Sequence, residues 1–246
     1  MNGNRNQKGF TLAEVLITLG IIGVVAAMTI PTLVTNYQKN MYLNRFKKSY
    51  AMVLNGFRNY LAASYCSTNE CSKISDYLVE AVNNAKYDNI DDVFDTAFKG
   101  SKICKGENEI ENCVSKTYEG FNGSELSIGV TNPYGVMFAD GSAFTVANGV
   151  AGVMLVVLDT NGAQKPNKLG YDAFVFVMDM SDEKIKNIPV IFPYGTSAAG
   201  IPGLEVWKDS AALCGNPGEK IQVSDDASGW GCAARIIEEG YKITYY

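Results

Sequence analysis

The sequence of 246 residues contains no histidine. Histidine is the side chain whose ordinary pKa lies closest to neutrality, and it is the commonest protein ligand for metal ions. Its absence excludes Ser-His-Asp and Cys-His nucleophilic sites and every histidine-based zinc site. The chain also lacks a C-x-x-C pair, a P-loop and the G-x-G-x-x-G and G-x-S-x-G motifs. We therefore expect a protein that is not an enzyme and that requires no cofactor.

Positive charge is in the minority. The chain holds 21 Lys and Arg residues against 26 Asp and Glu residues, which gives a formal net charge of −5. This acidic balance argues against nucleic acid as the main partner of the globular part. The length is sufficient for one domain of ordinary size and an anchoring segment.

A long apolar run occupies residues 8–33, and Glu14 is its one acidic residue. About 20 apolar residues are enough to cross a bilayer as a helix. A secretory signal peptide fits poorly, because the run is too long and no A-x-A-like site precedes a polar start. An ordinary anchor fits poorly too, because a charge inside a membrane helix costs about 3 kcal/mol and usually marks a partner.

The junction Lys8-Gly9-Phe10 precedes this run and, with Glu14, resembles the N-termini of type IV pilins and of the pseudopilins of type II secretion. The resemblance implies that a membrane-embedded prepilin peptidase cuts between Gly9 and Phe10. Phe10 then becomes the N-methylated first residue, and Glu14 is the acid that the family keeps near it. Helix-weakening residues of many members correspond to Gly20, Gly23 and Pro31.

Cleavage would give Glu14 a partner of opposite charge. Removal of residues 1–9 takes away Arg5, Lys8 and no acid, which changes the net charge from −5 to −7. The new amine at Phe10 lies about one helical turn from Glu14. In a filament, Glu14 of one subunit can pair with the Phe10 amine of a neighbour, because an unpaired buried charge is costly. Two alternatives are that Glu14 caps its own helix or contacts its own amine.

All six cysteines follow the apolar run, and none precedes Cys66, which argues against a lipoprotein. An even number on one side of a membrane indicates disulfides formed in an oxidising compartment. Closeness in sequence favours three pairs, and free or partly paired thiols are the alternative. The favoured pairs are Cys66 with Cys71, Cys104 with Cys113, and Cys214 with Cys232.

Two indicators disagree about membrane orientation. Basic residues after the apolar run outnumber those before it, and this count alone would place the C-terminal side in the cytoplasm. The cysteines suit the periplasm instead, and the resemblance implies a cytoplasmic leader. We therefore expect a single-pass protein of the bacterial inner membrane with a cytoplasmic N-terminus, which reaches a periplasmic or extracellular filament after assembly.

The hydrophobic pattern predicts an α+β, pilin-like fold. Apolar residues recur at steps of three and four beyond Pro31, which indicates one helix from about residue 10 to 63. Short helices are expected at 74–82 and 90–98. From about residue 126 the period changes to two, with a hairpin at Asp140-Gly141 and a last edge strand at 241–245. The predicted segments are a leader at 1–9, a membrane or filament-core half at 10–35, an amphipathic half at 36–63, and a head at 64–246.

Residues 159–172 join two predicted strands and could bind calcium, which takes oxygen ligands. The candidate ligands are Asp159, Asn161, Asn167 and Asp172. The loop has no terminal Glu and does not match the EF-hand pattern. The resemblance adds weight, because major pseudopilins hold calcium in a loop near their sheet. The alternative is a polar turn in which Asp and Asn bond their own backbone.

The function that these features predict is structural. We expect a subunit of a type IV pilus or a type II secretion pseudopilus. Its expected partners are other copies, other pilin-like subunits, prepilin peptidase, the inner-membrane assembly machinery and membrane lipid. The alternative is a membrane-anchored periplasmic binding domain that does not polymerise.

Overall fold

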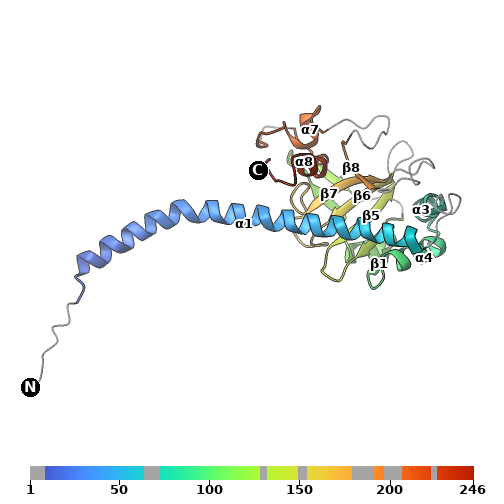
Figure 1. Cartoon of the computed structure of the whole chain (residues 1–246), viewed down its shortest axis with the longest axis horizontal. Coiled ribbons are helices and arrows are strands. Elements are labelled where there is room, and N and C mark those ends of the chain that lie inside the picture. Colours follow the sequence, from blue (N-terminus) through green and yellow to red (C-terminus); the bar gives the residue numbers. More distant parts are fainter. Residues whose placement is uncertain are drawn as a thin grey trace, which may run out of the picture. The chain divides into compact units, whose positions relative to one another are not determined.

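The computed structural model describes residues 9–63, 73–127, 132–148, 154–178, 191–196, 207–222 and 226–246 (Figure 1). The predicted pair of Cys66 with Cys71 lies outside the described residues. Two compact units divide the chain, residues 1–41 and residues 42–246.

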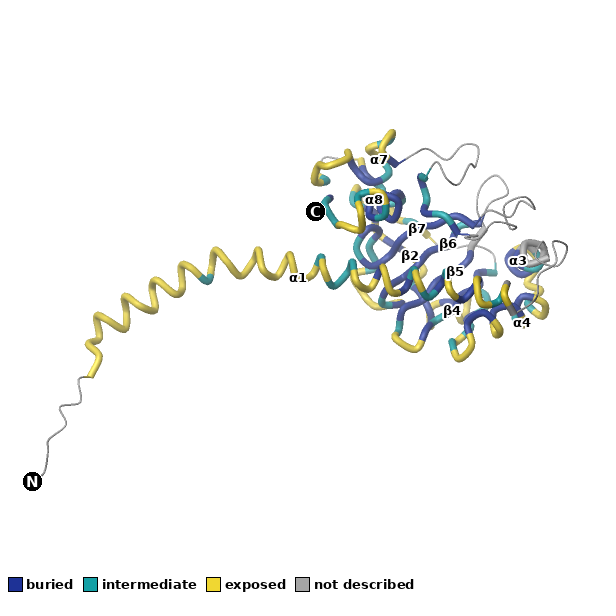
Figure 2. The backbone as a smooth tube through the Cα atoms, in the orientation of Figure 1, coloured by how far each residue is buried: buried dark blue, intermediate teal, exposed yellow. Residues whose placement is uncertain are grey.

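Helix α1 (Leu12–Ala63) has 52 residues, includes Pro31 and supplies most of the first unit. Its large apolar side chains from Leu12 to Tyr37 are exposed, as the colouring of Figure 2 shows. It is long and apolar enough to cross a membrane, with a mean hydropathy of 2.2 in its most apolar window. Its threonine hydroxyls suit such a setting, because they donate to carbonyls of the same helix; Thr29 bonds Val25 at 3.0 Å and Thr35 bonds Pro31 at 2.9 Å.

In the second unit, the later part of α1 packs on the sheet through a buried face. Phe46, Val53 and Phe57 recur at steps of seven and four and are at most 3 % exposed. The Phe46 ring lies 4.5 Å from the Phe174 ring, centroid to centroid. Gly56 is required on the same face, because a Cβ there would lie 2.0 Å from Cε1 of Phe98.

The main sheet has six antiparallel strands in the order β1-β4-β5-β6-β7-β8. Its strands are β1 (Lys102–Lys105), β4 (Tyr134–Met137), β5 (Ala143–Asn148), β6 (Met154–Asp159), β7 (Ala173–Met178) and β8 (Ile191–Pro193). The predicted hairpin at Asp140-Gly141 joins β4 to β5. Strands β2 (Thr117–Glu119) and β3 (Glu125–Ser127) form a separate pair.

Both faces of the main sheet are covered. Phe144, Phe174 and Phe176 belong to the core that includes α1, α3 (Lys73–Asn84), α4 (Asp88–Ala97) and α8 (Cys232–Glu238). On the opposite face, Val157 and Val175 belong to a second core. That core includes residues of η1 (Ile110–Asn112) and of β2, and α5 (Gly106–Glu109) precedes η1 in the chain. The α+β architecture and the two helices predicted after α1 are thus confirmed.

The two predicted disulfides within the described residues are present. Cys104 in β1 bonds Cys113, with their Cα atoms 6.2 Å apart. Cys214, at the end of α7 (Ala211–Cys214), bonds Cys232 at the start of α8, with 5.1 Å between Cα atoms. The C-terminal region is therefore tied covalently, as predicted.

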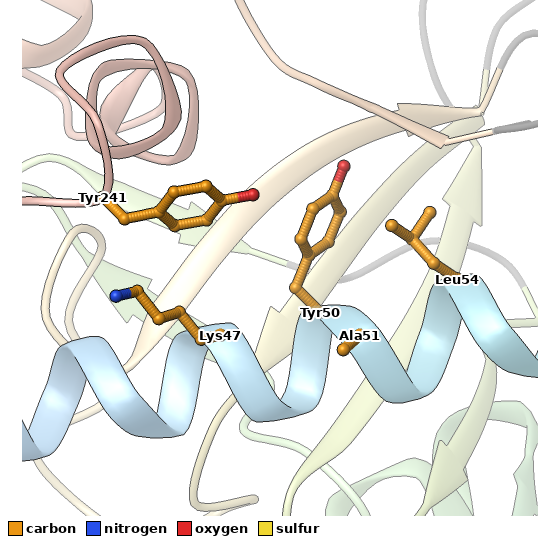
Figure 3. Close-up of a pocket in the computed structure, with 5 residues that line it drawn as sticks. All are labelled: Lys47, Tyr50, Ala51, Leu54 and Tyr241. Atoms are coloured by element: carbon orange, nitrogen blue, oxygen red, sulfur yellow. The ribbon is translucent and has the colours of Figure 1, made fainter.

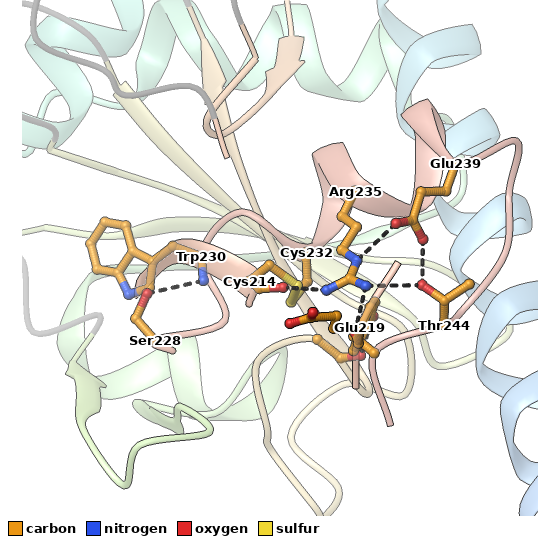
Figure 4. Close-up of a disulfide and its surroundings, with 10 residues drawn as sticks. Cys214, Glu219, Ser228, Trp230, Cys232, Arg235, Glu239 and Thr244 are labelled. Atoms are coloured by element: carbon orange, nitrogen blue, oxygen red, sulfur yellow. Dashed lines mark hydrogen bonds and ion pairs between the residues drawn. A yellow bond between two sulfur atoms is a disulfide. The ribbon is translucent and has the colours of Figure 1, made fainter. Parts of the chain in front are cut away.

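A buried guanidinium group organises the chain around the second disulfide (Figure 4). Arg235 is 0 % exposed and donates to the carbonyl oxygens of Cys214 and Glu219, both at 2.7 Å. Its Nε also donates to Glu239 Oε1 at 3.1 Å. It also donates to the Thr244 hydroxyl at 3.2 Å, so one side chain bonds four separate residues of the C-terminal region.

The strand predicted at 241–245 is wrong. These residues have no strand structure, although the Ile221 amide donates a hydrogen bond to the Tyr245 carbonyl at 2.7 Å. Tyr241 has a φ of 60°, which no strand residue adopts. Aromatic packing fixes the tail instead, since the Tyr246 ring stacks on the Tyr171 ring at 4.1 Å.

Candidate functional site

The N-terminal end of α1 forms a reciprocal cap between Thr11 and Glu14. The Glu14 carboxylate oxygen Oε2 accepts hydrogen bonds from the Thr11 backbone amide at 2.8 Å and from the Thr11 hydroxyl at 2.9 Å. The Glu14 amide donates to Thr11 Oγ1 at 3.2 Å. This is a capping box of the T-x-x-E type, which satisfies backbone donors that the first turn leaves open. Within one chain, Glu14 therefore caps its own helix.

Thr11 was not among the residues singled out from the sequence. The signal was present, because Thr followed three residues later by Glu before an apolar run is typical of a helix start. Both hydrogen bonds from Thr11 end on Oε2 of Glu14, and Oε1 takes part in neither. The cap therefore holds the carboxylate in place and leaves one oxygen out of these bonds.

The predicted cleavage site lies just before this cap. Gly9 and Phe10 precede the first helical residue, Leu12, and both are exposed, with Phe10 88 % exposed. A peptidase needs an extended, accessible peptide bond, and helical structure does not cover this one. The geometry at Gly9 and Phe10 is therefore compatible with processing there.

Gly20 and Gly23 lie in α1, and nothing in the single chain requires glycine at either position. A Cβ at either residue would meet no atom within 4 Å. Each glycine costs about 1 kcal/mol of helix stability relative to alanine. Small residues in membrane helices allow other helices to approach closely. Any steric reason for these two glycines therefore lies outside the single chain.

Comparison with protein families places a motif on this segment. Residues 4–30 match the model of the prokaryotic N-terminal methylation motif. This motif is the signature of type IV pilins and pseudopilins. No curated protein and no solved structure matches the chain.

The methylation motif includes Gly9, Phe10, Glu14, Gly20 and Gly23 and ends one residue before Pro31. It supports pilin-type prepilin processing. Together with the apolar helix, it fits a membrane-anchored precursor. The matched segment covers 27 of 246 residues, so the comparison says nothing about the head, which is described here from its own structure.

The four predicted calcium ligands lie together in the loop between β6 and β7. Asp159 ends β6 and is 0 % exposed. Its Oδ2 accepts a hydrogen bond from the Tyr118 hydroxyl at 2.6 Å, and its Oδ1 accepts one from the Asn161 amide at 3.1 Å. Burial raises the pKa of Asp159 to about 8 against the lowering effect of these bonds, and Asp172 adds to the rise.

Asp172 closes the other end of the loop and is also 0 % exposed. Its carboxylate accepts hydrogen bonds from the backbone amides of Asn167 at 2.9 Å and Lys168 at 2.7 Å. Burial raises its pKa as well. These bonds from the loop to its own carboxylates match the polar-turn interpretation.

The loop also holds oxygen atoms that suit a cation. Thr160 Oγ1, Asn161 Oδ1 and Asn167 Oδ1 are buried and have no hydrogen-bond partner. Buried polar atoms are almost always bonded, so three neighbours in one loop call for a ligand or water. Within the described residues, no group of three His, Cys, Asp or Glu side chains could hold a metal. An ion here would therefore rely on two carboxylates and neutral oxygens, which is a donor set that calcium accepts.

Proposed function

We propose that the protein is a structural subunit of a type IV pilus or of a type II secretion pseudopilus. The observation that carries the proposal is an exposed apolar helix whose one acid, Glu14, lies capped at its start within a methylation motif. In this proposal prepilin peptidase cuts between Gly9 and Phe10 and the N-terminal helix assembles with other pilin-like subunits. Before assembly the protein spans the inner membrane once with a cytoplasmic N-terminus.

The capping box explains how the acid would serve assembly. In lipid an unpaired carboxylate is costly, and the Thr11 bonds to Oε2 offset part of that cost. They also hold the carboxylate at the N-terminus of the helix, where negative charge is favourable. The Phe10 amine of a neighbouring subunit can then pair with Glu14 at its other oxygen, which favours one axial register over others.

Two substitutions of Glu14 separate pairing from capping. Glutamine keeps an oxygen that can accept from Thr11 and removes the charge, whereas alanine removes both. We expect Glu14→Gln and Glu14→Ala each to reduce the yield of filaments sheared from cells roughly tenfold or more, because both substitutions remove the charge pair. If Glu14→Gln formed normal filaments and Glu14→Ala formed few, charge pairing would be contradicted, and helix capping would be the whole role of Glu14 in assembly.

The controls for this experiment are processing and folding. Mass spectrometry of the wild type should show a chain that begins at N-methylated Phe10. Both variants should retain the Cys214–Cys232 disulfide, which reports a folded head. Wild-type protein that stays monomeric in detergent and forms no filaments would support the alternative, a membrane-anchored binding domain.

We propose, in addition, that the loop between β6 and β7 binds calcium. Asp159 and Asp172 would supply the charge, and Thr160, Asn161 and Asn167 would supply neutral oxygens. A bound ion would neutralise two buried carboxylates and join the end of β6 to the start of β7. No other part of the proposed function depends on it.

Calcium should raise the thermal unfolding midpoint of the detergent-solubilised chain. A ligand at about 100 times its Kd adds about 2.7 kcal/mol. For a domain of this size, this corresponds to a shift on the order of 5 to 10 °C. Asp172→Asn should abolish the shift, whereas Asp140→Asn, which alters the hairpin between β4 and β5, should keep it. An equal midpoint in calcium and in chelator would contradict the proposal.

A further inference from the structure

An open groove of about 230 Å³ lies between α1 and the C-terminal tail (Figure 3). Lys47, Tyr50, Ala51 and Leu54 line it from the helix, and Tyr241 lines it from the tail. Tyr241 is 38 % exposed, and the Lys47 ammonium lies 5.3 Å from the centre of its ring. The walls are therefore aromatic and aliphatic, with one positive charge.

The groove continues along α1 as a surface stripe formed by Lys47, Ala51, Leu54 and Arg58. Steps of 100° per residue place these four positions within a narrow arc of the helix. Lys47, Ala51 and Arg58 are exposed, and Leu54 is half-buried. The two cations are eleven positions apart, which is about 16 Å along a helix. The stripe therefore has an apolar centre between two positive ends.

The cations of the stripe are available to a partner. Among the described residues, neither Lys47 nor Arg58 forms an ion pair, whereas the adjacent Lys48 pairs with Asp140 at 2.7 Å. Lys47 contacts the Tyr241 ring, a contact that leaves its charge uncompensated. A partner with two or more acids along a short segment would complement the stripe.

Helix α4 carries such a segment. Asp88, Asp92 and Asp95 are exposed and recur at steps of four and three, so they share one face over about 10 Å. That face is opposite the buried residues of the helix. The Phe94 ring packs 5.8 Å from the Phe57 ring of α1 in the same chain. Because α4 packs on α1 through its buried face, its acidic face points away from its own stripe.

We propose that the stripe binds the acidic face of α4 on a second copy of this chain. The cleaved chain has a net charge of −7, so copies repel one another unless opposite charges meet locally. The two surfaces are different, so this head-to-tail contact can repeat from copy to copy, and it gives an open filament where the rotation between copies does not close into a ring. The proposal rests on the proposed filament function and adds a contact between heads and stems.

Charge reversal tests this contact. We expect the double variant Lys47→Glu with Arg58→Glu, and the triple variant Asp88→Lys with Asp92→Lys and Asp95→Lys, each to form roughly tenfold fewer filaments. One chain with all five changes should recover filaments, because each reversed stripe then meets a reversed α4. Lys116→Glu is the matched control and should assemble normally, since its pair with Glu111 lies elsewhere.

A second measurement reads the contact itself. A chain with Ala51→Cys and Asp92→Cys, treated in membranes with a short bismaleimide, should give dimers and a ladder that either single variant lacks. Absence of the ladder, or no recovery by the five-change chain while wild type forms filaments, would overturn the contact. If the wild-type protein forms no filaments, the proposed function fails. The cross-linked dimers still test the contact independently, because their presence or absence shows whether these two surfaces meet.

Discussion

Replacement of Arg235 by alanine should lower the free energy of unfolding by about 3 to 5 kcal/mol, because it breaks a buried charged network. The guanidinium group is 0 % exposed, and its removal leaves the carbonyl oxygens of Cys214 and Glu219 without these donors. Glu239, 19 % exposed, would lose its cation. The loss is a large share of the 5 to 15 kcal/mol that stabilises a typical domain.

The two tryptophans of the chain make this measurement direct. The centre of the Trp207 ring lies 5.5 Å from the Arg235 guanidinium carbon, and Trp230 precedes Arg235 by five residues in the sequence. Urea unfolding of the detergent-solubilised protein, followed by tryptophan fluorescence, should show the loss. Lys208→Ala removes an exposed pair with Glu238 in the same region and should cost at most about 1 kcal/mol. Equal effects of the two substitutions would show that burial of Arg235 does not matter.

Stability should fall as pH rises from about 4 to about 8, which is the reverse of the behaviour that ion-paired carboxylates produce. Asp159 has a pKa of about 8 in the folded protein because of its burial, against about 3.9 in an unfolded chain. In this window the folded state holds a proton that the unfolded state has released, so raising the pH favours unfolding. Asp172 acts in the same direction.

Urea midpoints measured in calcium chelator between about pH 5 and pH 8 should report this loss, which is at most on the order of 4 kcal/mol for one carboxyl group. Asp159→Asn should flatten the dependence. Asp140→Asn is an informative control, because the pKa of Asp140 is shifted the other way. Burial raises this pKa, but hydrogen bonds from Lys48 and Ser142 lower it by more, so the net shift is downward. Its contribution is lost only as pH falls below about 4. A wild-type curve that rises from pH 5 to pH 8 would contradict the prediction.

The sequence was most informative where structure depends on neighbours in the chain. Three predictions depend on residues at most 26 positions apart in the sequence, and all three are confirmed. They are the long apolar helix, the Asp140-Gly141 turn and the two described disulfides. The loop from 159 to 172 was recognised for the same reason. Tyr118, which donates to Asp159 from 41 residues away, was not predicted, because a bridge between Glu119 and Lys168, residues distant in the sequence, places β2 against this loop.

The error at residues 241–245 has the same physical cause. Alternation of aromatic residues predicts an edge strand, yet a strand needs a neighbour with open backbone groups. Packing of Tyr246 on Tyr171 and the hydrogen bond from Arg235 to Thr244 fix the tail in another conformation. The groove between α1 and Tyr241 depends on that conformation, so the sequence pattern could not indicate it.

The packing of Phe46, Val53 and Phe57 into the sheet also has a practical consequence for work with the isolated head. A recombinant head that starts at residue 64 would leave Phe144 and Phe174 without these partners and expose a broad apolar surface, which favours aggregation. A soluble version should start close to Tyr42, where the second compact unit begins. The residues that serve as part of the head's interior thus belong to the same helix as the exposed apolar segment that is long enough to cross a membrane.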